Sequence, residues 1–334
     1  MSLLNENYPR PIWQVTLDGK DLTGLMAPRL MDLVLTESRS EEADQLDITL
    51  SDHDGLLEIP KRNAKIKVAL GWSHIGLIDK GEFNVDEVEH RGAPDQITIR
   101  ARSASLDGAL RNRTERSFHK KTIEEIVKAI ASANNLQAVV DKEIAKKVIP
   151  HIDQVEESDM AFLTRLGKRY DTVATVKEGK LLFLRIAGAK TSSGQPMPTK
   201  AIFRAEGDQH TYLEASRDTY TGVVAYWRDP RKATKTKVVV GVIGNAKHLR
   251  ETYANEQDAL ESATSEWERL RRGEASMRIT LAMGIPDITP QFVINFPDFK
   301  KPINEKKWLV KTISHRLGDG GLVTDLELEV NLPV

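Results

Sequence analysis

Apolar and polar residues alternate in short runs along the first hundred residues of the chain. The clearest runs are Leu46–Leu50, Ile66–Leu70 and Ile97–Ala101, in which every second residue is apolar. A period of two is typical of antiparallel strands that bury one face and expose the other. Turn-forming pairs such as Asp18-Gly19 and Asp54-Gly55 separate the runs. Short strands divided by turns predict a small β-barrel or β-sandwich.

The pattern becomes helical after Phe118. Residues Thr122–Glu125 read as a capping box, and apolar residues follow at helical spacing, namely Ile123, Ile126, Val127 and Ile130. A second helix is predicted over Ser158–Tyr170, and the stretch 187–196 has the composition of a loop. Residues 116–200 are therefore expected to form a helix-containing insert.

Strand patterns return after the insert, at 220–227 and 237–240. A third helix is predicted to follow Asn255, a residue type that commonly caps helix N-termini, and to end near Gly273. Its expected apolar seam consists of Leu260, Ala263, Trp267 and Leu270. The remainder of the chain is again expected to be β.

An internal repeat is the most informative feature of the sequence. The segment Phe83–Arg91 matches Trp308–Arg316 in apolar phase and in its His-Arg ending. Two further pairs occur in the same order along the chain: Leu46–Leu50 with Met277–Leu281, and Ile97–Ala101 with Val323–Leu328. One such pair is expected by chance between any two amphipathic strands, but three pairs in order indicate a duplicated unit.

Together these patterns predict an α+β, mainly β fold with two related antiparallel β-barrel domains and a helix-containing insert between them. The expected domains are a first barrel at 1–115, the insert at 116–200, and a second barrel at 201–334 that carries an inserted helix near 255–272.

Composition narrows the class of protein further. The 334 residues include 48 Lys and Arg against 49 Asp and Glu, a net charge of −1, and no cysteine. Disulfides and thiolate metal sites are thereby excluded, as is a binder of nucleic acid or lipid driven by overall charge. The N-terminus lacks the pattern of a secretion signal, and the most apolar stretch, Val238–Ile243, is too short to span a bilayer. We therefore expect a soluble protein made in the cytoplasm.

Charge is unevenly distributed even though the total is balanced. Residues 36–58 are strongly acidic, whereas 111–121 and 228–250 are basic. Two interpretations stay open: solvated surfaces, or complementary subunit contacts and a charged channel wall. Neither basic stretch has the aromatic and glycine pattern of an RNA-binding sheet, so no specific nucleic-acid binding is expected.

Few residues of the sequence suggest a catalytic, cofactor-binding or metal-binding site. The familiar nucleotide, esterase and zinc-protease motifs are absent, and Asp52–Gly55 is expected to be a hairpin turn because the later ligands of a calcium loop are missing. His119 and the His151-Ile152-Asp153 segment flank the insert and could meet on folding, although a histidine near a strand end more often bonds backbone carbonyls. We expect no catalytic, cofactor-binding or metal-binding residue, no cofactor, and no enzymatic activity.

Several segments resemble, in order, the conserved blocks of the phage late control D family of tail hub proteins: Glu157–Tyr170, Gly179–Phe183, Gly222–Trp227, Glu266–Leu270, Gly284–Pro290 and Trp308–His315. The resemblance covers essentially the whole chain. It implies a baseplate hub of a contractile phage tail or a phage-like tailocin, related to the N-terminal part of VgrG.

The resemblance also implies partners and a location. Family members are homotrimers with two barrel domains per chain, and they join the sixfold tail tube to the threefold central spike beside other baseplate and tape-measure proteins. Assembly is expected in the bacterial cytoplasm and the final place in the virion, with no membrane contact of the free chain. The chain ends soon after the second barrel, without the spike that VgrG appends, which favours a separate hub.

Three alternatives remain at this point: a peptidoglycan-binding or lytic module of a tail, a VgrG-like hub of a secretion system, and a β-rich carbohydrate binder. The last predicts a row of exposed aromatic residues, whereas the five Trp residues are scattered along the sequence.

Overall fold

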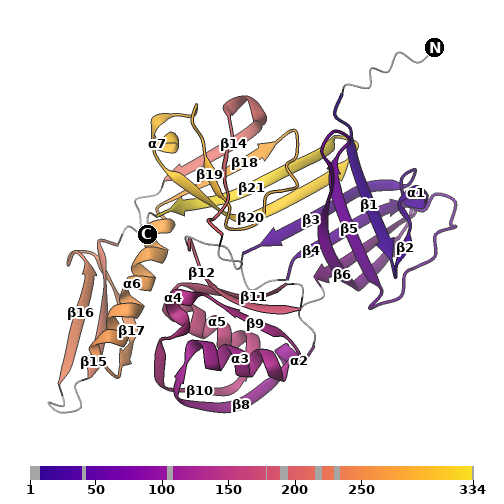
Figure 1. The fold of residues 1–334 in the computed structure, drawn as a ribbon. Coiled ribbons are helices and arrows are strands. Elements are labelled where there is room, and N and C mark those ends of the chain that lie inside the picture. Colours follow the sequence, from indigo (N-terminus) through magenta and orange to yellow (C-terminus); the bar gives the residue numbers. More distant parts are fainter. Residues whose placement is uncertain are drawn as a thin grey trace.

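The described residues form four β-sheets, and the three longest helices lie in the insert and beside the small sheet of the C-terminal unit (Figure 1). The computed structural model describes residues 8–39, 43–103, 108–177, 179–188, 195–214, 220–228 and 234–332. Strands predominate over helices throughout this part of the chain, which confirms the predicted α+β, mainly β class. The expected loop at 187–196 lies largely outside the described residues.

The N-terminal unit is a twisted antiparallel sheet around its own core. Alternate residues of each strand point inward, so that Leu33, Ile48, Val68 and Phe83 are fully or almost fully buried. The elements are β1 (Pro11–Leu17), β2 (Lys20–Asp21), α1 (Thr23–Met26), β3 (Leu30–Ser38), β4 (Gln45–Ser51), β5 (Lys65–Trp72), β6 (Gly76–Arg91) and β7 (Gln96–Ser103).

The insert has a separate hydrophobic core in which two helices pack on short strands. Thr122 caps the helix that begins at Ile123, and the reciprocal contacts of a capping box with Glu125 are present; Ser158 caps the next long helix. Both predicted helices are confirmed. The elements are α2 (Gly108–Arg111), β8 (Arg113–Thr122), α3 (Ile123–Ala133), β9 (Gln137–Val140), α4 (Lys142–Ala145), β10 (Val148–Ser158), α5 (Asp159–Tyr170), β11 (Thr172–Lys177) and β12 (Lys180–Arg185).

The C-terminal unit contains a second sheet core and a small three-stranded sheet covered by one long helix. The elements are β13 (Thr199–Ala201), the 3₁₀ helix η1 (Arg204–Glu206), β14 (Gly207–Glu214), β15 (Gly222–Arg228), β16 (Lys235–Gly241), β17 (Ala246–Tyr253), α6 (Glu256–Arg272), β18 (Ala275–Leu281), β19 (Val293–Asn295), α7 (Lys301–Asn304), β20 (Lys307–Gly318) and β21 (Gly321–Asn331).

Helix α6 begins after Asn255 and ends before Gly273, as predicted, with the Asn255 side chain accepting a hydrogen bond from the Asp258 backbone. The predicted seam is wrong at one position, because Leu260 is 46% exposed. The buried face instead consists mainly of small residues, including Ala259 and Ala263, which let the helix approach β15 and β16 closely. In Figure 1 this helix lies between that small sheet and the rest of the molecule.

The strand pairing confirms the internal repeat. The order β4-β7-β6 in the first unit is matched by β18-β21-β20 in the second, with antiparallel pairing throughout. A register shift falls between Val85 and Glu87 in β6 and between Val310 and Thr312 in β20, at equivalent places. A shared irregularity is far stronger support for duplication than shared alternation, because β-bulges are specific features of a strand pair.

The correspondence extends to six strands in each unit. Taken in chain order, β1, β3, β4, β5, β6 and β7 correspond to β13, β14, β18, β19, β20 and β21. Phe83 of β6 lies opposite Ile66, and its equivalent Trp308 of β20 lies opposite Ile294. The units differ at one edge, where β1 pairs antiparallel with β5 but β13 pairs parallel with β19.

The expectation of two closed barrels needs correction. Among the described residues the strands of the two duplicated units form one open 13-stranded sheet that runs from β14 to β2. Strand β20 is long enough to pair with β19 at its start and with β3 over Thr312–Gly318. The edge of β3 that would close the first unit is therefore used to join the second.

Candidate functional site

The structure brings together two of the residues weighed for chemistry in the sequence. His119 and His151 face each other across β8 and β10, with 3.1 Å between their Nδ1 atoms, instead of bonding backbone carbonyls. Within the described parts of the chain, no three His, Cys, Asp or Glu side chains are grouped so as to hold a metal ion. No described helix is both long and apolar enough to cross a membrane.

Two groups of deeply buried charged side chains lie where the structural units meet. The first such place, here called the repeat junction, consists of Lys80 of β6, Glu37 of β3 and His315 of β20. The Lys80 Nζ atom lies 2.5 Å from Glu37 Oε2, and the two side chains are only 3% and 9% exposed. His315 Nε2 lies 3.4 Å from the same oxygen.

The repeat junction joins the two duplicated units through several polar contacts. Lys80 also donates to the backbone oxygen of Pro286 at 3.0 Å, and Trp72 Nε1 donates to the backbone oxygen of Gly284 at 2.7 Å. Both carbonyls belong to the loop between β18 and β19 of the second unit. Polar groups buried at a boundary in this way fix one relative position of the two units, because any slip leaves them unpaired.

Burial and neighbouring charges shift the pKa values of Glu37 and His315 at the repeat junction. Burial by itself would raise the pKa of Glu37, but His315 and Lys80 outweigh burial and hold this pKa below its ordinary value of 4.5. Burial lowers the pKa of His315 below 6.5, and Lys80 contributes in the same direction against the opposing effect of Glu37. These directions favour an ionised Glu37 beside Lys80 and a neutral His315 whose Nε2 atom lies near the carboxylate.

We expect acid to weaken the fold through His315. An unfolded histidine takes up a proton near its ordinary pKa of 6.5, whereas the folded His315 does so only at lower pH, so stability falls as pH drops below 6.5. The free energy of unfolding then falls by up to about 1.4 kcal/mol per pH unit for one proton. Urea unfolding between pH 7.5 and 5.5 should give a flatter pH dependence for His315→Gln than for the wild type.

The control for this measurement is His74→Gln, because His74 is exposed in the turn between β5 and β6. The His74→Gln variant should show the same pH dependence of stability as the wild type. Equal slopes in His315→Gln and the wild type would contradict the assignment of a neutral buried imidazole.

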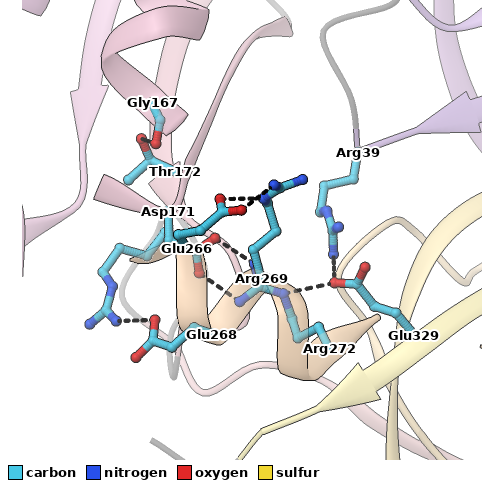
Figure 2. A network of polar contacts seen from close by, with 10 residues as sticks. Arg39, Gly167, Asp171, Thr172, Glu266, Glu268, Arg269, Arg272 and Glu329 are labelled. Atoms are coloured by element: carbon cyan, nitrogen blue, oxygen red, sulfur yellow. Dashed lines mark hydrogen bonds and ion pairs between the residues drawn. The ribbon is translucent and has the colours of Figure 1, made fainter. Parts of the chain in front are cut away.

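The second buried ionic cluster, here called the insert junction, is centred on Arg272 at the end of α6. Arg272 Nη1 donates to Asp171 Oδ2 at 2.6 Å, and its Nε atom lies 3.0 Å from Glu329 Oε1 in β21. Arg39, just after β3, reaches the same Glu329 oxygen at 2.8 Å. Figure 2 shows Arg272 between Asp171 and Glu329, with Arg39 on the far side of Glu329. One guanidinium thus connects the insert, α6 and the main sheet.

Local structure positions the acid of this cluster. Asp171 is the C-cap of α5 in a left-handed conformation with φ of 51°, and it turns the chain from the helix into β11. Thr172, the next residue, donates to the Gly167 backbone oxygen at 3.3 Å (Figure 2). Helices α5 and α6 are further joined by Arg169 and Asp258 at 2.7 Å.

A cavity of about 560 Å³ lies between the main sheet and the insert. Its charged lining includes the Lys80–Glu37 pair and a second pair, Lys177 with Asp44, whose Nζ and Oδ2 atoms are 3.0 Å apart. Burial raises the pKa of Asp44 above its ordinary value against the opposing effect of Lys177. These acids are engaged by cations of the same chain.

Sequence reasoning missed the residues of both junctions. His315 belongs to the His-Arg ending that revealed the repeat, and Arg272 lies seven residues after the buried Ser265 on the same face of α6. A charged residue at a buried position of a predicted helix indicates a buried ionic contact, and this could be read from the sequence. The acids could not be identified in advance, because Asp171 and Glu329 meet Arg272 only through the fold.

The uneven charge of the sequence is partly neutralised within the chain. Acidic residues of 36–58 pair with Arg29, Lys80 and Lys177, while Lys121 and Lys247 of the basic stretches pair with Glu125 and Glu266. Exposed cations remain on the small sheet at Arg228, Lys235, Lys237 and Arg250. Arg231 and Lys232 lie outside the described residues.

Comparison with known proteins identifies the family. A family model described as phage tail baseplate hub (GPD) matches residues 41–321. A probable baseplate hub protein of Escherichia phage 186 is 40% identical over 363 aligned positions, which cover 96% of this chain and 93% of the phage protein.

Solved structures share the fold at much lower identity. The 43 kDa tail protein of prophage MuSo2 from Shewanella oneidensis has a TM-score of 0.71 at 15% identity, with 96% of this chain and 98% of that chain covered. A chain of the Francisella PdpA–VgrG complex has a TM-score of 0.58 at 8% identity and matches 97% of this chain over 58% of its own length. The late control D resemblance and the related VgrG fold are thus confirmed, and the chain belongs to the phage tail baseplate hub family, as a component of the tail baseplate in the virion.

Proposed function

We propose that three copies of this chain form the centre of a contractile-tail baseplate and join the sixfold tail tube to the threefold central spike. The observation that carries this proposal is the duplicated six-strand unit with its shared register shift. A closed ring of three chains that each hold two similar units presents six similar surfaces around one axis. Such a ring can meet a sixfold ring on one side and a threefold spike on the other.

Differences between the two units supply the threefold features in this proposal. The helical insert follows only the first unit, and the small sheet with α6 interrupts only the second, between β14 and β18. We propose the division of the chain into hub units at 1–115 and 201–334 and an insert at 116–200. Separate hydrophobic clusters in these parts support the division.

A hub must also transmit force without letting its units slide. The continuous sheet across β3 and β20 and the two buried junctions suit that task, because all three must break before the units separate. The role is mechanical in this proposal and involves no catalysis and no cofactor. The tail tube, the central spike and further baseplate and tape-measure proteins are the proposed partners, met during assembly in the bacterial cytoplasm.

Native mass spectrometry of the chain co-expressed with its spike protein tests the proposal. We expect a complex that contains three copies of the chain, because two similar units per chain match six positions only in a trimer. A threefold cryo-EM reconstruction of the baseplate should then relate the β6 and β20 regions by a rotation of about 60°. A closed dimer as the sole complex, or no such rotation, would reject the symmetry-matching role.

The lytic alternative makes a different prediction in the same preparation. Zymography of the purified chain would show clearing of peptidoglycan comparable with a lysozyme control. Clearing at that level would replace the mechanical role by an enzymatic one.

A further inference from the structure

The two-stranded ribbon of β8 and β10 presents a group of polar side chains that the hub function does not use. His151 lies directly opposite His119 and Asp153 directly opposite Ser117, so that all four project from the same face of the ribbon. The His151 and Asp153 side chains are 51% and 42% exposed. His119 and Ser117 are exposed as well.

The opposite face of the ribbon anchors it to the insert. Phe118 and Ile152, which alternate with these polar residues, pack against the insert core, and the Phe118 ring lies 5.8 Å from that of Phe162. The strand pairing and this packing hold both backbone segments in place. The two imidazoles are consequently held in a defined relation, with ring centroids 4.5 Å apart in a stacked arrangement.

A chain of hydrogen bonds orients His151. Asp153 Oδ2 lies 2.9 Å from His151 Nε2, and Ser117 Oγ donates to Asp153 Oδ1 at 2.6 Å. A carboxylate only accepts, so the proton of a neutral His151 sits on Nε2 and its Nδ1 carries a lone pair directed at His119. Metal-binding histidines usually have this arrangement, with the second ring nitrogen donating to a carboxylate.

The separation of the facing nitrogens matches a bridging metal ion. Two imidazole nitrogens bound at about 2.0–2.1 Å to one tetrahedral Zn²⁺ are about 3.3 Å apart. The observed distance between His119 Nδ1 and His151 Nδ1 is 3.1 Å.

We propose that His119 and His151 form a binding site for a divalent transition-metal ion, with Asp153 and Ser117 as positioning residues. Imidazole ligands favour Zn²⁺, Cu²⁺ and Ni²⁺ over the harder Mg²⁺ and Ca²⁺. The chain supplies two ligands, and the exposed face leaves the other coordination positions to water. This property is independent of the proposed symmetry matching.

Isothermal titration of the untagged full-length chain with Zn²⁺ tests the site. We expect one ion per chain, loss of this binding in both His119→Ala and His151→Ala, and a decrease in affinity of about 10–100-fold in Asp153→Asn. Ser117→Ala should weaken binding less than Asp153→Asn does. The matched control is His74→Ala, which removes an exposed histidine from another part of the chain and should bind Zn²⁺ like the wild type.

A spectroscopic measurement identifies the ligands directly. Electron paramagnetic resonance with one equivalent of Cu²⁺ should show coupling to two imidazole nitrogens in the wild type, and this coupling should be lost in His119→Ala. Circular dichroism should show intact folding of every variant, because the substituted side chains are exposed. If the wild type binds Zn²⁺ no more tightly than the His119→Ala, His151→Ala double variant, or if Cu²⁺ couples to fewer than two imidazoles, the proposal is overturned.

Discussion

We expect Arg272→Met to lower the free energy of unfolding by about 3–5 kcal/mol, the usual cost of breaking a buried ion pair from one side. Methionine keeps most of the side-chain length, so the loss reports on charge more than on packing. Asp171 is only 4% exposed and would be left without its guanidinium. Glu329 would keep Arg39. Urea unfolding of the purified chain, followed by circular dichroism, measures the change.

Two further variants separate the ionic effect from general damage to α6. Arg271→Met alters the exposed neighbour of Arg272 and should change the free energy of unfolding by about 0–1 kcal/mol. Adding Asp171→Asn to Arg272→Met should restore much of the loss, because the uncompensated charge is removed and asparagine tolerates the left-handed φ of 51°. A double variant no more stable than Arg272→Met alone would contradict an ionic origin.

The second large effect is expected at the repeat junction. Lys80→Met should also cost about 3–5 kcal/mol in free energy of unfolding, because it leaves the buried carboxylate of Glu37 facing a neutral His315. The same variant removes the hydrogen bond to Pro286 and with it a direct contact between the duplicated units. Chemical denaturation at pH 7.5 provides the measurement.

The neighbouring strand offers a matched control. Lys67 of β5 pairs with Glu82 at 3.8 Å, but its side chain is 63% exposed, so Lys67→Met should cost no more than about 1 kcal/mol. Combining Lys80→Met with Glu37→Gln should recover part of the stability by removing the orphaned charge. Equal effects of Lys67→Met and Lys80→Met would show that the repeat junction contributes no more than a surface pair.

The two junctions have the same physical design. Each places a buried cation at a boundary between units. Arg272 lies between Asp171 of the insert and Glu329 of β21, whereas Lys80 pairs with Glu37 of its own unit and donates to the Pro286 backbone oxygen of the second unit. Such clusters favour one arrangement of the units over its neighbours, since a misaligned junction buries unpaired charge.

Local signals in the sequence were sufficient to predict the helices and strands. The capping box at Thr122, the N-caps at Ser158 and Asn255, and the alternation of β4, β6 and β7 involve residues within a few positions of each other, so they act before any tertiary contact forms. The family resemblance was also readable, because its blocks are contiguous segments, and the comparisons confirm it.

The features that the sequence did not predict all depend on contacts between residues far apart in the sequence. Leu260 has the hydrophobicity of a seam residue, but the small sheet packs against a neighbouring face of α6. Barrels were expected from the short alternating strands and the turns between them, but the pairing of β3 with β20 joins the units into one open sheet. His119 and His151 meet because β8 and β10 pair in one particular register.

The sequence by itself determined the strand and helix periods, their caps, and the duplication seen in Phe83–Arg91 and Trp308–Arg316. These are properties of contiguous segments, and backbone sterics with alternating polarity fix them locally. Only the tertiary structure decided that the repeats share one open sheet and that Arg272 and Lys80 sit at its boundaries. That outcome depends on which strand edges meet and which charges are buried together, and these choices are made when the whole chain packs and water leaves the interfaces.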